Sequence, residues 1–529
     1  MHRRRRHLLQ AALAAPLAAF AQTPQRNLLP VDRKPAPGAT DTMALLRAER
    51  RALVIGNGSY RFAPLKNPAN DVRALSEELK RLGFDVTAAF DLPRKEMTAA
   101  IGAYAESLAR TRAVGLFYFA GHGLQLAWRN YLVPVDAAIA RQADIPSMCV
   151  DVNAVIEGIG RAANPMNVVI LDACRENPFA REVPLEQKGL SQVDAPPGTL
   201  LAYATSPGNL ASDGDGANGL YTEQLLREMK VPEAKIEDVF KRVRLAVRRR
   251  SNGRQIPWES TSLEQDFWFI PPKELRAQSE RDAERVFKEE AVLWEKARLA
   301  STPGPLEDYL RRYPSGRFAE IAQAQLDRIL AQQGEARIEA VTSPQNPYTL
   351  GTAIARTDYK LGDTYTYNLV DEFSRVVHAT ATHQVTRISS YEVIYDDGKV
   401  ITDLLGNPVL NRDGRQFTPN QINPADFVVG RRWETRYTVD HPTRGLFRLR
   451  MELRVTGRER IRVPAGTFDA FRIDGRGTQY GTSVTGPVEL THWFAPQVVR
   501  RPVATTYVTR VNAIVGRADR EELAAFKEG

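Results

Sequence analysis

The chain has 529 residues, 43% of them hydrophobic and 26% charged, which is enough for two or three globular domains and excludes a single compact body. The formal net charge is +9, but basic residues are spread along the chain apart from Arg3–Arg6 and Arg248–Arg250, so we expect no nucleic-acid partner. Two cysteines, Cys149 and Cys174, are too few for a disulfide framework.

The N-terminus has the pattern of a secretory signal peptide. It reads "MHRRRRHLLQAALAAPLAAFAQ", a cationic start and a short Ala/Leu segment, with Ala19-Phe20-Ala21 ahead of Gln22. The apolar segment is far shorter than the roughly 20 residues that span a bilayer, so we predict a signal peptide over residues 1–21. The paired arginines also resemble a twin-arginine signal. We expect a periplasmic or secreted protein, exported by the Sec or twin-arginine route, with an uncleaved amphipathic anchor as the alternative.

Residues 22–48 lack periodicity and predict a linker, and residues 49–271 then alternate apolar runs with amphipathic segments. Strands are predicted in "ALVIGN", "DVTAAF", "AVGLFYFAGHG", "NVVILDAC" and "TLLAYATS", and "IPWESTSLEQDFWF" suits a closing edge. Near-continuous apolar strands separated by helices indicate a three-layer α/β domain with a mostly parallel sheet. The helices are expected over 68–82, 94–110, 151–162, 219–229 and 235–250.

The rest of the chain changes character twice. Residues 272–334 are charged and predict a helical linker or repeat-like segment, with a charged spacer as the simpler interpretation. Residues 345–515 alternate polar with apolar or aromatic residues between turn signals, which predicts an antiparallel β-domain, and residues 516–529 are expected to form a C-terminal tail. The pattern "VPAGTFDAFRI … WFAP" resembles small β-domains of the bacterial envelope and suggests an envelope partner.

Two reactive side chains end predicted strands. His122 follows "FYFAG" and Cys174 follows "VVILDA", 52 residues later. Because crevices form at the carboxyl ends of parallel strands, His122 and Cys174 can meet if their strands are neighbours. The imidazole can then take the thiol proton and later protonate a leaving amine, while the N–H groups of Gly123 and Cys174 stabilise an oxyanion. A disulfide between Cys149 and Cys174 would silence this chemistry.

These motifs resemble a known family. "AGHG" with His122, and Asp172-Ala173-Cys174-Arg175-Glu176 at the caspase spacing, resemble the caspase-like cysteine peptidases, and more closely their bacterial and metacaspase-type members with a D-x-C motif. The segment "GTLLAYATSPGNLASDGDGANGLYTEQLL" is similar to the one that follows the nucleophile strand in those relatives. The resemblance covers under half of the chain and implies a cysteine endopeptidase with His122 as base and Cys174 as nucleophile.

The departures from caspases concern substrate choice. Asp172 stands where caspases carry Gln, and Glu176 where they carry Gly. A carboxylate at position 172 would attract a cation by about 4 kcal/mol at about 4 Å, so we predict cleavage after Arg or Lys of protein or peptide substrates. Asp213 or Asp215 can supply a second pocket acid, although "SDGDGANG" is equally a glycine-rich loop with Asx turns. Self-processing after Arg181 or Lys188 would match such a pocket, with ordinary surface charge as the alternative.

Other residues carry weaker signals. Cys149 has no histidine motif beside it and is expected to be a buried apolar residue. The histidines of the β-domain lack metal-ligand spacing, so we expect no metal site and no cofactor, and calcium dependence is open because no acidic loop is dense enough. The sequence gives no indication of the oligomeric state. The alternative function is a non-catalytic caspase-like scaffold of the cell envelope, with a ligand-binding β-domain.

Overall fold

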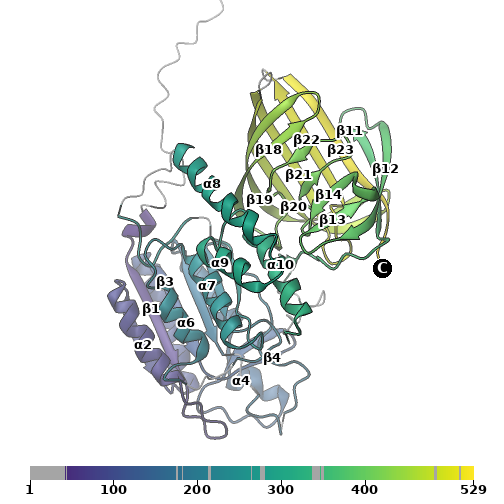
Figure 1. The fold of residues 1–529 in the computed structure, drawn as a ribbon. Helices are drawn as coiled ribbons and strands as arrows, with labels where there is room; N and C mark the ends of the chain where they lie inside the picture. The colour runs from purple at the N-terminus through teal and green to yellow at the C-terminus, as the bar shows by residue number, and fades with distance from the viewer. Residues whose placement is uncertain are drawn as a thin grey trace, which may run out of the picture.

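The computed structural model describes most of the chain beyond its N-terminal segment. The described residues are 42, 44–173, 177–181, 183–211, 216–263, 265–273, 280–335, 346, 349, 351–481, 485–511 and 514–529. The predicted signal peptide, most of the linker, Cys174 and Asp213 lie outside them. Figure 1 shows an α/β domain, three connecting helices and a β-barrel in chain order. No helix in the described ranges combines the length and apolar character needed to cross a membrane.

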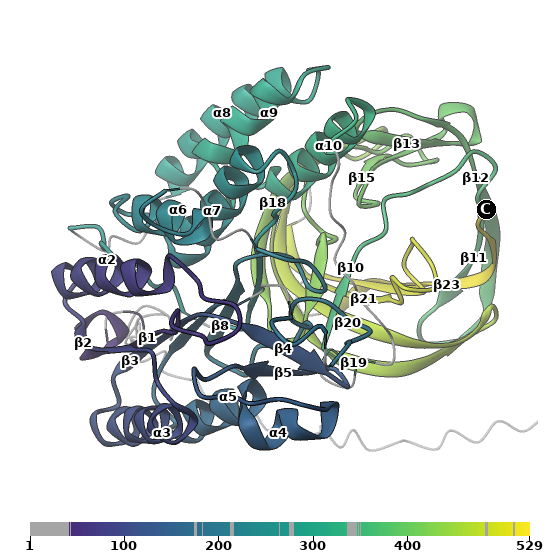
Figure 2. The same ribbon diagram turned by 90° about the horizontal axis from the view of Figure 1, so that it is seen from below.

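The α/β domain is built on a six-stranded sheet. Strand order is β2-β1-β3-β7-β8-β9; the first five strands run parallel and β9 is antiparallel to β8. Helices α2, α6 and α7 cover one face, and α3 and α5 cover the other (Figure 2). The bounds are β1 Arg50–Gly56, α2 Pro68–Arg81, β2 Asp85–Phe90, α3 Arg94–Thr111, β3 Val114–Ala120, α5 Val152–Arg161, β7 Asn167–Asp172, β8 Thr199–Tyr203, α6 Leu220–Glu228, α7 Ile236–Arg250 and β9 Trp258–Thr261.

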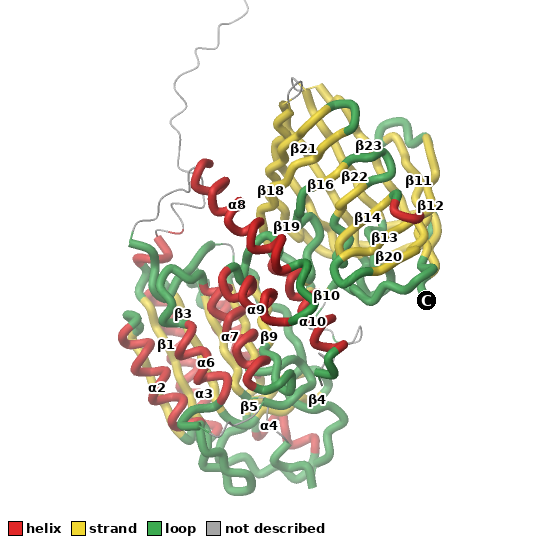
Figure 3. Tube along the Cα trace, in the orientation of Figure 1, coloured by secondary structure: helices red, strands yellow, loops and turns green. Residues whose placement is uncertain are grey.

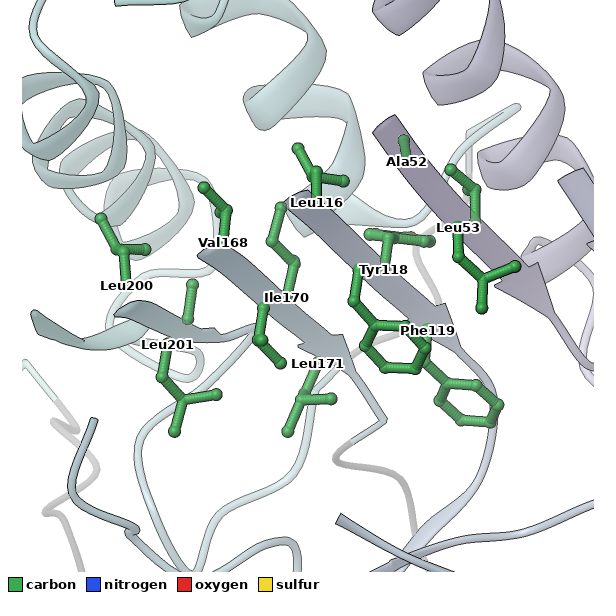
Figure 4. Close-up of a cluster of buried hydrophobic side chains, with 14 of the residues drawn as sticks. Ala52, Leu53, Leu116, Tyr118, Phe119, Val168, Ile170, Leu171, Leu200 and Leu201 are labelled. Atoms are coloured by element: carbon green, nitrogen blue, oxygen red, sulfur yellow. The ribbon is translucent and has the colours of Figure 1, made fainter. Parts of the chain in front are cut away.

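The predicted strands and helices of this domain match the structure within a few residues. Every residue of β3, β7 and β8 is buried, as expected for strands covered on both faces. Their side chains, among them Leu116, Ile170 and Leu201, form one core with the covering helices (Figure 4). The domain also begins earlier than expected, because residues 44–47 are helical and Leu45 joins this core.

A second, small sheet follows β3 directly. Strands β4 (Gly123–Leu126), β5 (Arg129–Leu132) and β6 (Val150–Asp151) are antiparallel, with the short helix α4 (Ile145–Met148) before β6. Ala127 and Trp128 join β4 to β5 and both have positive φ, 51° and 67°, which matches the strand twist in a two-residue hairpin. Strands of two to four residues leave no periodicity to detect, so this sheet was not predicted.

Three helices connect the two domains: α8 (Glu280–Ala297), α9 (Pro303–Arg312) and α10 (Ala319–Gln332). They are more than a charged spacer, because Trp294, Tyr309 and Phe318 share one apolar cluster with residues of the barrel. The helices lie between the α/β domain and the barrel (Figure 3). On the α/β side, the buried Arg248 of α7 pairs with Asp327 and, at 2.6 Å, with Glu335.

The C-terminal domain is antiparallel, as predicted, and it closes into a barrel. Alternation is clear in β19, where Met451, Leu453 and Val455 are buried and the residues between them point outward. Strands β10 (Thr352–Ile354) and β17 (Asp426–Val428) pair separately. The barrel strands are β11 Thr364–Asp371, β12 Val377–Ile388, β13 Glu392–Tyr395, β14 Val400–Asp403, β15 Pro408–Leu410, β16 Gln416–Phe417, β18 Arg432–His441, β19 Gly445–Val463, β20 Gly466–Gly481, β21 Thr485–Phe494, β22 Ala504–Val511 and β23 Ile514–Lys527.

The expected C-terminal tail, residues 516–529, is instead mostly strand. β23 pairs with β22 on one side and with β11, the first barrel strand, on the other. It therefore closes the barrel and removes both free edges. "REELAAFK" is too rich in charge and alanine to suggest a strand, and its pairing partner β11 lies some 150 residues away in the sequence, so the tail prediction was wrong.

Candidate functional site

The two strands that carry the predicted dyad are neighbours. β3 and β7 pair in parallel register, with Ala120 opposite Asp172 at their carboxyl ends. His122 follows Ala120 by two residues, and Cys174 follows Asp172 by two residues. Cys174 lies outside the described residues, so its distance from His122 is not part of this geometry. The structure shows that β3 and β7 are adjacent and end at the same edge of the sheet.

The imidazole of His122 is held in a defined orientation. His122 is 3% exposed, and its Nε2 lies 2.7 Å from the carbonyl oxygen of Ala63. A carbonyl can only accept, so Nε2 carries the proton and Nδ1 is the basic nitrogen. The ring also packs edge-on against Tyr60, with centroids 4.6 Å apart. The loop after β1 thus fixes the Nε2 side of the His122 ring.

Tyr60 also fixes the backbone of His122. The His122 N–H donates to the Tyr60 hydroxyl at 3.0 Å, and that hydroxyl donates to the carbonyl of Val133 at 2.9 Å. Val133 in turn donates its N–H to the carbonyl of His122 at 3.0 Å. The histidine is therefore clamped between the loop that follows β1 and the segment that follows β5.

The loop after β1 is rigid because polar side chains bind its backbone. The buried Asn57 donates to the carbonyls of Leu92 and Val133 and accepts from the N–H of Leu92, at 2.9–3.3 Å. Asp91 accepts from Ser59 and Gly58 at 2.7–2.8 Å; burial acts to raise its pKa, but these hydrogen bonds hold it below the usual range. These contacts hold the loop that carries Tyr60 and Ala63 against His122.

Gly123 packs directly on the residue before the predicted nucleophile. A Cβ at position 123 would lie 2.5 Å from the carbonyl oxygen of Ala173, closer than side chains tolerate. Gly121 donates its N–H to the carbonyl of Asp172 at 3.3 Å. The segment from Gly121 to Gly123 thus crosses the end of β7, and the absence of a side chain permits the close approach.

Asp172 is deeply buried at the same edge. It is 1% exposed, and its Oδ2 accepts from the hydroxyl of Thr222 on α6 at 3.3 Å. The Thr222 hydroxyl lies 2.7 Å from that of Tyr118 on β3. The carboxylate therefore lies on the α6 face of the sheet within a hydroxyl network.

The loop that contains Asp213 and Asp215 is attached to α2 at its end. The carboxylate of Asp71 accepts hydrogen bonds from Asn218 and Gly219, at 2.9 and 3.0 Å. Asp213 and Asp215 themselves lie outside the described residues.

The segment after the predicted nucleophile is partly buried. Arg181 and Lys188 are both exposed, but the carbonyl of Lys188 accepts from Gln125 at 3.0 Å and the next residues enter the core. Ser191 exchanges hydrogen bonds with Asn130 at 2.7–2.8 Å. Asn130 thus braces the segment around Ser191.

The other cysteine and two histidines of the β-domain are buried or hydrogen-bonded within the fold. Cys149 is a buried free thiol whose pKa burial raises to about 12. His383 pairs with Asp396, and His492 with Thr505, at 3.0 and 3.1 Å. Within the described residues, no group of three or more His, Cys, Asp or Glu is placed to hold a metal ion, and the acidic loop 212–215 is outside that search.

Three contributors to the site were missed by sequence analysis: Tyr60, the carbonyl of Ala63 and Thr222. A backbone carbonyl has no residue signature, so Ala63 could not have been found. Tyr60 follows the "GNGS" turn, and Thr222 lies one turn into a helix after the glycine-rich loop. Only their proximity to His122 and Asp172 in three dimensions reveals their roles.

Comparison with known proteins agrees with this fold. Residues 49–268 match the family model of the caspase domain. A stretch of 195 residues is 30% identical to mucosa-associated lymphoid tissue lymphoma translocation protein 1 of Homo sapiens and to its homolog of Mus musculus. The match covers 35% of this chain, and 23% and 22% of those proteins, so the chain spans less than a quarter of the relatives it matches.

Proposed function

Because residues 49–268 form a caspase domain, we propose that this chain is an exported cysteine endopeptidase that cleaves after Arg or Lys, with Cys174 as nucleophile, His122 as general base and acid, and Asp172 as the acid that binds the basic side chain. The observation that supports the proposal is the β3–β7 register, which pairs Ala120 with Asp172 at one edge of the sheet. His122 and Cys174 each follow one of these residues by two positions in the sequence. The match of residues 49–268 to the caspase domain model supports the coarser statement that this is a caspase-like cysteine peptidase.

The residues suggest a two-step mechanism. Nδ1 of His122 takes the proton of the Cys174 thiol, and the thiolate attacks the scissile carbonyl carbon to form a C–S bond. The carbonyl electron pair moves onto oxygen, which the N–H groups of Gly123 and Cys174 stabilise. The C–N bond then breaks as His122 protonates the leaving amine. In the second step His122 deprotonates water, which attacks the thioester and releases the acid and the Cys174 sulfur.

The Ala63 carbonyl takes the role of the orienting group in this mechanism. When His122 becomes an imidazolium, its Nε2–H bond to Ala63 becomes charge-assisted and therefore stronger. A neutral carbonyl stabilises the imidazolium less than a carboxylate would. The basicity of His122 therefore depends on the loop geometry that holds Ala63, Tyr60 and Asn57 in place.

The specificity proposal rests on Asp172. A carboxylate that is 1% exposed at the sheet edge, with a hydroxyl as hydrogen-bond donor, favours a cationic substrate group over an anionic one. Asp213 is proposed as a second pocket acid, because its loop is fixed to α2 beside α6 through Asp71. The D-x-C motif is what links this pocket to metacaspase-type peptidases.

The test is a peptide panel that differs only in Arg, Lys or Asp before the scissile bond. We expect cleavage after Arg and Lys, none after Asp, and no cleavage by Cys174→Ala. In Asp172→Asn the amide oxygen can still accept from Thr222, while kcat/KM on the Arg peptide falls about a hundredfold, since a buried charge pair is worth about 2–5 kcal/mol. Preference for Asp refutes the specificity, and binding of peptides without cleavage by the wild type favours the scaffold alternative.

Export is a separate part of the proposal and rests on residues 1–21. Its test is the N-terminus of the mature protein from the periplasm or medium, read by mass spectrometry. A chain that begins at Gln22 supports cleavage of a signal peptide after Ala21. An intact N-terminus on a membrane-associated chain favours the uncleaved anchor instead.

A further inference from the structure

Arg501 of the β-domain is surrounded by aromatic rings. It lies in the segment between β21 and β22, and its guanidinium carbon is 4.9 Å from the ring centroid of Tyr395, 5.8 Å from that of Tyr365 and 5.9 Å from that of Tyr367. We call these four residues the Arg501 cluster. The three tyrosines come from β11 and β13, so neighbouring parts of the barrel build the cluster together.

The cluster is rigidly constructed. The Tyr359 hydroxyl donates to the carbonyl of Arg500 at 3.3 Å, and that of Tyr367 donates to the carbonyl of Pro502 at 2.7 Å. The backbone is therefore held immediately before and immediately after Arg501. Tyr365 is fixed in turn, because its hydroxyl donates to Glu528 at 2.9 Å. The position of the guanidinium follows from these contacts.

Arg500, the residue before Arg501, is a buried arginine with a full set of ion pairs. The side chain of Arg500 is 0% exposed and pairs with Asp358, Asp363 and Glu528 at 2.9–3.1 Å. Among the described residues, no carboxylate pairs with Arg501. Two acids near the cluster are already paired with other cations: Glu528 with Arg500 and Arg356, and Asp396 with His383 and Arg412.

Three polar atoms of the Arg501 cluster lack a hydrogen bond of normal length. Nε and Nη1 of Arg501 are buried without a hydrogen-bond partner, and so is the hydroxyl of Tyr395, a residue that is 0% exposed. Buried donors without acceptors cost free energy, and a buried cation without a counter-ion costs more. The tyrosine faces attract the cation, and the hydroxyls of Tyr395 and Tyr367 lie beside the guanidinium, but these groups are neutral and leave its charge without a counter-ion. Arg501 and Tyr395 together therefore form a set of donors that an oxyanion would satisfy.

We propose that the Arg501 cluster is a binding site for a compact oxyanion, a carboxylate or a phosphate, carried by a ligand of the β-domain. Arg501 supplies the charge and charge-assisted hydrogen bonds, Tyr395 supplies a further donor, and the tyrosine rings keep water away from the guanidinium. This function is separate from peptide cleavage and uses none of the residues proposed for that reaction.

The test measures anion binding to the full-length chain by isothermal titration calorimetry at constant ionic strength, with inorganic phosphate and butyrate as probes. We expect saturable binding of at least one anion, weakened at least tenfold in Arg501→Gln. The anion that binds identifies the ligand group as a phosphate or a carboxylate. Thermal unfolding of the same samples should show a rise in Tm with that anion in the wild type and no rise in Arg501→Gln.

Two further variants keep the outcome interpretable. Tyr395→Phe removes one unpartnered hydroxyl and keeps the ring, so the fold should persist while binding weakens. Arg462→Gln removes an exposed, outward-facing arginine of the same barrel and should bind as the wild type does. The proposal is overturned if neither anion binds saturably, if folded Tyr395→Phe and Arg501→Gln bind as the wild type does, or if Arg462→Gln loses as much affinity as Arg501→Gln.

Discussion

Gly123 is the position where one added methyl group perturbs the strand-end geometry most directly. In Gly123→Ala the new Cβ would lie 2.5 Å from the carbonyl oxygen of Ala173 and 3.0 Å from the side chains of Ala173 and Leu190. Ordinary contact begins near 3.4 Å, so the backbone must separate by about 0.9 Å. That displacement moves the Gly123 N–H away from the end of β7, where the proposed oxyanion forms.

The expected loss is large in rate and moderate in stability. Loss of one oxyanion donor lowers kcat by about 10²- to 10³-fold, and overpacking costs about 1–3 kcal/mol of unfolding free energy. The assay is kcat and KM on an Arg peptide, together with thermal unfolding to establish that the variant is folded. Because the donor acts on the transition state, kcat should fall while KM changes little.

The matched control is Gly102→Ala in α3. Gly102 is exposed, and a Cβ there meets nothing within 4 Å, so the same substitution should leave kcat unchanged and stabilise the helix by about 0.5–1 kcal/mol. A folded Gly123→Ala that cleaves as fast as the wild type would refute the proposed placement of the oxyanion donors.

Three further predictions concern other parts of the chain. Tyr60→Phe leaves the buried N–H of His122 without its acceptor, while the Val133 carbonyl still accepts from Asn57. We therefore expect the free energy of unfolding to fall by about 1–3 kcal/mol and kcat to fall at similar KM. Unchanged kinetics would contradict the proposed role of Tyr60 in holding His122. Iodoacetamide at pH 8 should label Cys174 in the folded protein but not Cys149, whose thiol pKa is raised to about 12 by burial, as peptide mapping after quenching can show; rapid labelling of Cys149 would count against this account. Burial lowers the pKa of His492 from 6.5 to about 4. Between these two pH values the unfolded chain binds more protons than the folded one, so the free energy of unfolding falls as the pH falls through this window. In denaturant unfolding the deficit of His492→Gln against the wild type should therefore shrink from pH 7.5 to pH 5, and a constant deficit would contradict the shift.

The sequence predicted the α/β domain well because its strands are continuous apolar runs. β3 and β7 have no polar residue before Asp172 except Asn167, and such strands fit only a sheet covered on both faces. The glycines around His122 and the D-x-C motif marked the strand ends, and the register of β3 with β7 brings those ends to one edge. Local pattern and global fold agree here, so local reasoning sufficed.

Long-range features escaped prediction for physical reasons. The orientation of His122 depends on the Ala63 carbonyl, some 60 residues away, and a backbone group carries no residue identity. β23 becomes a strand because β11 and β22 both offer it edges, whatever its weak intrinsic preference. The Arg501 cluster likewise joins residues of β11, β13 and the segment before β22, and nothing in their local sequence relates them.

The most direct measurement of the central claim is covalent trapping of the thiol with a peptide inhibitor that carries a basic residue, read by mass spectrometry of wild type and His122→Ala. If the imidazole and the thiol share one crevice beside an acidic pocket, the label will map to Cys174 in the wild type. Labelling will then be far slower in His122→Ala and absent with an Asp-bearing inhibitor. Equal labelling with and without His122, or a Cys174 that is inert or disulfide-bonded in the exported protein, would contradict it.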